Sequence, residues 1–143
     1  MSFTVTQTLI SRHCAQALVD AALSQAQTGQ IAICAAVVDA TGRLKAYMAM
    51  DGAPMVAEKM AQEKARAALL GLSSGQLGEA MESSPAGMLS MGLQDSINFL
   101  AGGQPIFIEG EIVGAIGIGG STPEQDDVCA LAALASIFNK TAD

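Results

Sequence analysis

The sequence has very few of the residues on which aromatic cores and metal sites usually depend. It contains no Trp, one Tyr, four Phe and a single His among 143 residues. A metal site built from several histidines is therefore excluded. The three cysteines, Cys14, Cys34 and Cys129, are widely spaced and odd in number, which predicts neither a disulfide framework nor a zinc site and favours a reducing compartment. We expect a core of small and flexible side chains with close backbone packing.

Positive charge is also scarce. Seven Lys and Arg against fourteen Asp and Glu give a net charge of -7, which argues against a nucleic-acid partner because no basic patch can be assembled. No apolar run is long enough to span a bilayer, and the N-terminus lacks the pattern of a secretory signal. We therefore expect a cytoplasmic protein with no membrane partner, folded as a single domain over residues 1–143.

Hydrophobic periodicity predicts the order helix, hairpin, helix, irregular middle, hairpin, helix. The expected helices cover about 6–27, 54–70 and the residues after Thr122, with one or two short helices between 73 and 103. The expected strands are 31–38, 44–50, 105–108 and 112–118. The last helix carries an apolar stripe of Val128, Leu131, Ala132, Ala135 and Phe138. Adjacent hairpins predict a mainly antiparallel sheet covered by helices, an α/β (α+β) sandwich of layers.

A glycine-rich strand precedes the last helix. The run 114–120 lacks the third glycine of a dinucleotide fingerprint, and too little chain follows it for a complete βαβ unit. We expect either another backbone or a flat ligand to pack against this strand. The amides of residues 119–122, at a helix N-terminus, are a candidate anion site.

Two polar residues lie within apolar helix patterns. His13 lies near the edge of the first helix's apolar stripe, where it either meets a ligand at a cleft or lies on the surface. Lys64 is surrounded by Ala and Met, so it extends outward, pairs with a carboxylate such as Asp51, or anchors a ligand. Seven of the eight methionines, all except Met1, either fill the core or line an adaptable cavity.

Several short motifs occur in a characteristic order along nearly the whole chain. They are Val37-Val38-Asp39, Met50-Asp51-Gly52-Ala53, Glu63-Lys64-Ala65, Gly102-Gly103-Gln104-Pro105-Ile106, Val113-Gly114-Ala115-Ile116-Gly117 and Thr122-Pro123-Glu124-Gln125-Asp126. With them the sequence resembles the GlcG/HbpS-like family, or haem-degrading domain family, which includes the C-terminal domain of propanediol-utilisation cobalamin adenosyltransferase. The resemblance implies a profilin-like sandwich with a five-stranded antiparallel sheet, assembled as a homo-oligomer from dimer to octamer.

The resemblance also implies a ligand. Some members bind haem in part through a His on the first helix, so it implies His13 as an axial ligand of haem iron, the only metal expected. The implied pocket is lined by Asp51, Lys64, Gly102, Gly103 and Pro105. Ala49 stands where many members carry an Arg suited to a haem propionate.

The sequence leaves three hypotheses for the function. The leading one is a small cytoplasmic oligomer that binds haem or a related tetrapyrrole, accessory to glycolate, glycerol or propanediol metabolism. The second is an enzyme or accessory factor for a small organic acid, diol or aromatic metabolite, with Lys64 and the 119–122 amides as anion contacts. The third is an assembly module without small-molecule chemistry, whose last helix and Met-rich segments form subunit interfaces.

Overall fold

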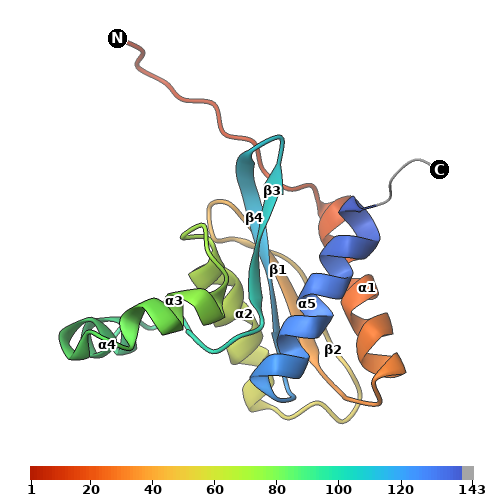
Figure 1. Cartoon of the computed structure of the whole chain (residues 1–143). Coiled ribbons are helices and arrows are strands. Elements are labelled where there is room, and N and C mark those ends of the chain that lie inside the picture. Colours follow the sequence, from red (N-terminus) through yellow and green to blue (C-terminus); the bar gives the residue numbers. More distant parts are fainter. Residues whose placement is uncertain (140–143) are drawn as a thin grey trace.

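The computed structural model describes residues 1–139 as a layered α+β fold (Figure 1). The elements are α1 (Arg12–Thr28), β1 (Cys34–Asp39), β2 (Leu44–Ala49), α2 (Val56–Ala68), α3 (Ser74–Met81), α4 (Pro85–Gly92), β3 (Gly103–Ile108), β4 (Glu111–Gly119) and α5 (Pro123–Phe138). The expected order of elements is confirmed, and the irregular middle contains two short helices. Together α3 and α4 project from the body of the molecule (Figure 1).

The sheet has the strand order β2-β1-β4-β3, and every neighbouring pair is antiparallel. Four strands are present within residues 1–139, so the expectation of five was wrong for this part of the chain. Residues 1–9 form no helix or strand. The first residue tied to the sheet is Ile10, whose N–H donates to the carbonyl of Val113 at 3.0 Å.

The first helix begins at Arg12, and the expected start near Thr6 was wrong. Ser11 is the N-cap, and its hydroxyl accepts a hydrogen bond from the Cys14 amide at 3.1 Å. This bond satisfies one of the free amides that every helix start exposes. The preceding residues alternate Thr with Phe or Val, and such β-branched and aromatic side chains favour extended backbone.

The sheet separates two helical layers (Figure 1). On one face, Ala35 and Val37 of β1 pack into a large core cluster that includes buried residues of α1 and α5. On the other face, Cys34, Ala36 and Val38 pack against alanines of α2. No methionine is among the fully buried residues of 1–139, and only Met50 packs, partly buried, against the large cluster. Of the two alternatives for the methionines, filling of the core was therefore wrong for all but Met50. Ala, Val and Ile fill the core instead.

The close approach of α2 to the sheet explains why the side chains between them are small. A Cβ on Gly117 of β4 would overlap the carbonyl oxygen of Ala61 and lie 2.6 Å from the amide nitrogen of Ala65. Helix α2 therefore rests directly on the backbone of β4. Of the two expectations for the glycine-rich strand, backbone packing is the one observed, because α2 fills the crevice with the protein's own atoms.

The last helix, α5, is capped as expected, but it buries a different face from the one predicted. Thr122 and Gln125 form a reciprocal capping box at its start. The side chains that α5 buries are Asp126, Cys129, Ala130 and Ala133. Val128 and Leu131 of the expected stripe remain 53% and 49% exposed. The apolar stripe of α5 thus faces away from the core of its own chain.

Within residues 1–139, every helix is too short or too polar to cross a bilayer.

Candidate functional site

A buried ion pair joins α2 to the first turn of α5. The Lys64 Nζ donates to Asp126 Oδ2 at 2.9 Å and to the Ile118 carbonyl at 3.0 Å. Both side chains are only 1% exposed. The pair therefore links α2, the end of β4 and α5 in an environment where an unpaired charge would be strongly unfavourable. A carboxylate partner for Lys64 was expected, but Asp51 was the wrong residue, since it lies exposed before α2.

The 102–103 segment packs tightly against this pair. A Cβ on Gly102 would lie 3.0 Å from the Lys64 Nζ and 2.6 Å from the Ile118 carbonyl oxygen. A Cβ on Gly103 would overlap the Lys64 carbonyl oxygen and lie 2.9 Å from the Ser74 hydroxyl. That hydroxyl donates to the Leu100 carbonyl at 2.6 Å and accepts from the Gly103 amide at 2.8 Å. Lys64, Gly102 and Gly103 are thus brought together, with protein atoms filling the space between them.

Sequence reasoning missed Asp126 and Ser74. The available signal for Asp126 was its position three residues after Pro123, in the first turn of a capped helix, where an acidic side chain is favoured. Ser74 carried no comparable signal, because its partners Leu100 and Gly103 lie 26 and 29 residues away in sequence.

The expected anion contacts are already engaged within the protein. The Ser121 amide donates to Asp126 Oδ1 at 3.0 Å, so a carboxylate of this chain occupies that part of the α5 N-terminus. The Lys64 ammonium is neutralised by the same carboxylate. A cavity of about 170 Å³ borders the pair, with Pro54, Met60 and Leu100 among its lining residues. This cavity therefore meets a paired charge rather than a free cation.

His13 lies in a different place. It is on the first turn of α1, which packs on the sheet face opposite α2. Its side chain is exposed, and within residues 1–139 no hydrogen bond or ion pair engages its ring nitrogens. None of the five cavities described for these residues is lined by His13. A single copy of the chain therefore does not unite His13 with Lys64, Gly102 and Gly103.

Pro105 is separated from both groups. It lies on β3 and lines an apolar groove between that strand and the C-terminal half of α5. Ala49, at the end of β2, is exposed. The six expected pocket residues thus occupy four locations: α1, the loop before α2, the Lys64 cluster and the β3–α5 groove.

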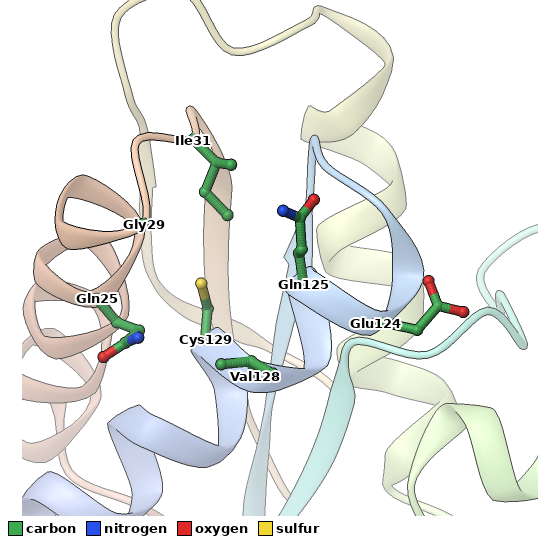
Figure 2. A pocket seen from close by; sticks show the side chains of 7 residues that line it. All are labelled: Gln25, Gly29, Ile31, Glu124, Gln125, Val128 and Cys129. Carbon is green, nitrogen blue, oxygen red and sulfur yellow. The ribbon is translucent and has the colours of Figure 1, made fainter.

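A further cleft of about 200 Å³ lies where the C-terminal end of α1 meets the start of α5. Figure 2 shows Gln25 and Ile31 on one side, with Gln125, Val128 and Cys129 on α5. Burial, together with the charge of Asp126, raises the pKa of the Cys129 thiol to about 11. Cys129 is therefore a protonated, weakly nucleophilic thiol at neutral pH. Among the described residues, no group of three or more His, Cys, Asp or Glu is placed to hold a metal ion.

Sequence comparison places this fold in a family. The family described as haem-degrading protein HbpS-like matches residues 10–135, and the chain belongs to this HbpS-like family. Protein GlcG of Escherichia coli is 34% identical over 113 residues, covering 79% of this chain and 83% of GlcG. Corrinoid adenosyltransferase PduO of Salmonella typhimurium is 29% identical over 134 residues, covering 92% of this chain but 40% of PduO.

Solved structures agree with this assignment. The protein ORFY of Klebsiella pneumoniae has a TM-score of 0.89 at 26% identity, covering 99% of both chains. PduOC in a complex with haem has a TM-score of 0.84 at 28% identity, covering 92% of this chain and 96% of that one. The same architecture therefore holds haem in at least one relative.

Proposed function

We propose that this protein binds haem or a related tetrapyrrole, with His13 as an axial ligand, on a surface completed by a second copy of the chain. The observation that carries the proposal is the state of His13: the only imidazole of the chain is exposed and has no partner within residues 1–139. The family and the haem complex of PduOC supply the ligand class.

The donor chemistry of the site fits haem. A neutral imidazole is a common axial ligand of haem iron. Arg12 is exposed in the adjacent position and offers a guanidinium for a propionate, a role that Ala49 cannot fill. The apolar enclosure that a porphyrin requires is absent around His13 in one protomer, so the proposal assigns that enclosure to the interface between copies.

We also place the protein in the cytoplasm, in a role accessory to glycolate, glycerol or propanediol metabolism. Three free cysteines support a reducing compartment. The resemblance to PduO supports the metabolic setting. The competing role, an enzyme or accessory factor for a small organic acid, diol or aromatic metabolite, has less support, because two of its expected anion contacts, Lys64 and the Ser121 amide, both bind Asp126.

A haemin titration tests the proposal. Haemin added to the ligand-free protein is expected to give a saturable Soret band shifted from that of free haemin, and His13→Ala is expected to weaken affinity at least tenfold. Gln16→Ala is the matched control, since Gln16 is exposed on the same helix and is expected to leave the spectrum unchanged. Free imidazole added to His13→Gly is expected to restore the band, a response that a purely structural role would not give.

Metal-free protoporphyrin separates ligation from nonspecific adsorption. If the iron is ligated, haemin binds the parent protein more tightly than protoporphyrin does, and this preference disappears in His13→Ala. Equal affinity for the two compounds, together with a spectrum unaffected by His13→Ala, would exclude His13 as the iron ligand.

A further inference from the structure

The first nine residues are all exposed and form no helix or strand. We call residues 1–9 the N-terminal arm. Phe3 and Val5 are each 95% exposed, and Leu9 is 41% exposed. The arm leaves the body at the buried residue Ile10 and runs away from it (Figure 1). The chain bends at Phe3. Where the arm runs extended, alternate side chains share one side, which groups Phe3 with Val5 and Thr4 with Thr6.

An apolar groove of matching character lies beside the base of the arm, because Ile106 in its wall pairs with Gly114 of β4, where a Cβ would lie 3.0 Å from the Ile10 side chain. The β3–α5 groove has a volume of about 250 Å³ and is lined by Pro105, Ile106, Phe107, Leu131, Leu134, Ala135, Phe138 and Asn139. Part of its wall is the outward apolar stripe of α5. A cavity on the order of 150 Å³ lined by apolar side chains already accommodates benzene. The groove is thus large enough for a Phe ring.

Charge distinguishes this groove from the other cavities. The remaining four cavities described for residues 1–139 are each lined by at least one Asp, Glu, Lys or Arg. The lining of the β3–α5 groove contains none. The side chains of the N-terminal arm are also uncharged. Phe3 and Val5 can therefore enter this groove without leaving a charged side chain desolvated and unpaired.

The conformation and length of the arm allow it to reach a second copy of the chain. The one local turn in the arm is made by Ser2, whose hydroxyl donates to the Thr4 carbonyl at 2.7 Å and accepts from the Thr4 amide at 3.4 Å. Within residues 1–139, the first backbone hydrogen bond to the body is made by Ile10, so the arm begins beside the groove of its own chain without occupying it. Nine extended residues span about 30 Å, which is long enough to cross to a neighbouring molecule.

We propose that the N-terminal arm of one copy docks in the β3–α5 groove of a second copy, with Phe3 and Val5 as the buried contacts. Two copies exchange arms reciprocally across a two-fold axis, which closes the assembly. The arm exchange stands on the arm and groove alone and does not depend on haem binding.

Disulfide trapping tests the exchange directly. The background is full-length Cys14→Ala, since Cys34 and Cys129 are buried and Cys14 is partly exposed. Phe3→Cys and Leu131→Cys are placed on separate chains with different tags, co-expressed, purified together and oxidised. A disulfide between positions 3 and 131 is expected to join the two tagged chains. When both changes are on one chain, at the protein concentration used for light scattering, an exclusively intramolecular disulfide would overturn the proposal, as would the absence of any 3–131 link.

Assembly mass gives an independent reading. Phe3→Asp combined with Val5→Asp is expected to lower the mass measured by light scattering at least twofold at equal protein concentration. Thr4→Asp combined with Thr6→Asp is the control, because it adds the same charge to the other side of the same arm, and it is expected to keep the parent mass. Circular dichroism checks that both variants fold. Equal masses for the parent and the Phe3/Val5 variant would refute the exchange.

Discussion

The carboxylate of Asp39 organises the turn between β1 and β2. Its Oδ1 accepts hydrogen bonds from the Thr41 amide at 2.8 Å, the Arg43 amide at 3.3 Å and the Thr41 hydroxyl. Burial alone would raise the pKa of this carboxyl, but these hydrogen bonds and the charge of Lys45 outweigh burial and hold the pKa below its ordinary value of 3.8. The charged form of Asp39 is therefore the one that stabilises the fold.

Asp39→Ala is expected to lower the free energy of unfolding by about 2 kcal/mol at pH 7, because two backbone amides and a hydroxyl lose a charged acceptor. The folded-state pKa is depressed, so this stabilisation is fully present above the unfolded-state value near 4 and is lost as the pH falls through the folded-state value. Urea unfolding between pH 7 and pH 2.5 should show the parent and Asp39→Ala converging on the acid side. Asp39→Asn, which retains an acceptor oxygen, should be less destabilised at pH 7. A difference independent of pH would contradict this account.

The Lys64–Asp126 pair is expected to show strong coupling. Lys64→Met leaves the Asp126 carboxylate buried without its cation, and removing one partner of a buried pair typically costs about 3–5 kcal/mol. Combining Lys64→Met with Asp126→Asn should cost clearly less than the sum of the two single changes, because neither partner is then left charged and alone. Denaturant unfolding of all four proteins measures this coupling. Additive single-variant effects would show that the pair is not an energetic unit.

At the scale of elements, local chemistry made most of the chain predictable. The turn after Asp39, the capping box at Thr122 and Gln125, and the four apolar runs are signals that depend on residues close in sequence. The start of α1 was missed because the Ser11 hydroxyl cap outweighs the apolar spacing that precedes it. The rotation of α5 was missed because this helix is apolar around most of its surface, so periodicity does not reveal which side faces the sheet.

The candidate site was predictable only in part, because its main contacts join residues that are far apart in sequence. An unusual Lys among alanines is visible in the sequence, and its need for a carboxylate follows from electrostatics. The choice of Asp126 over Asp51 depends on a contact 62 residues away, between α2 and α5. Likewise, the sequence motif indicates that Gly102 and Gly103 line a site. Only the structure shows that these glycines pack directly against Lys64.

The contact between α2 and β4 gives a prediction for a whole element. Gly117→Ala places a methyl group against the backbone of α2 at Ala61 and Ala65, where no flexible side chain can move aside. Helix α2 must shift, and we expect a loss of about 3 kcal/mol in the free energy of unfolding, at the upper end of typical overpacking costs. Gly92→Ala is the control, because a Cβ there meets no atom within 4 Å. Chemical denaturation of both variants checks this, and equal stabilities would mean that α2 does not lie against β4 as closely as described.

At the scale of the whole molecule, apolar surface is left uncovered in several places. Phe3 and Val5 on the arm, Leu131 on α5, and Leu89 and Leu93 near α4 are all about half exposed or more. A chain of 143 residues has enough small apolar residues to close one core without them. Apolar groups that a monomer leaves exposed in such numbers are typical of surfaces that associate. The net charge of -7 opposes association by general repulsion, so the association that we propose depends on specific apolar contacts.

Association of this kind makes stability depend on protein concentration. If arm exchange contributes to the folded state, each tenfold rise in protein concentration favours the folded dimer by about 1.4 kcal/mol, because unfolding then separates two chains. The denaturation midpoint of the parent protein is therefore expected to rise with concentration over a hundredfold range. The midpoint of the Phe3→Asp, Val5→Asp variant should rise less steeply, since it retains only those contacts between copies that do not involve the arm. Equal slopes for the two proteins would show that the arm adds nothing to the stability of the assembly, even where it is found to touch a second copy.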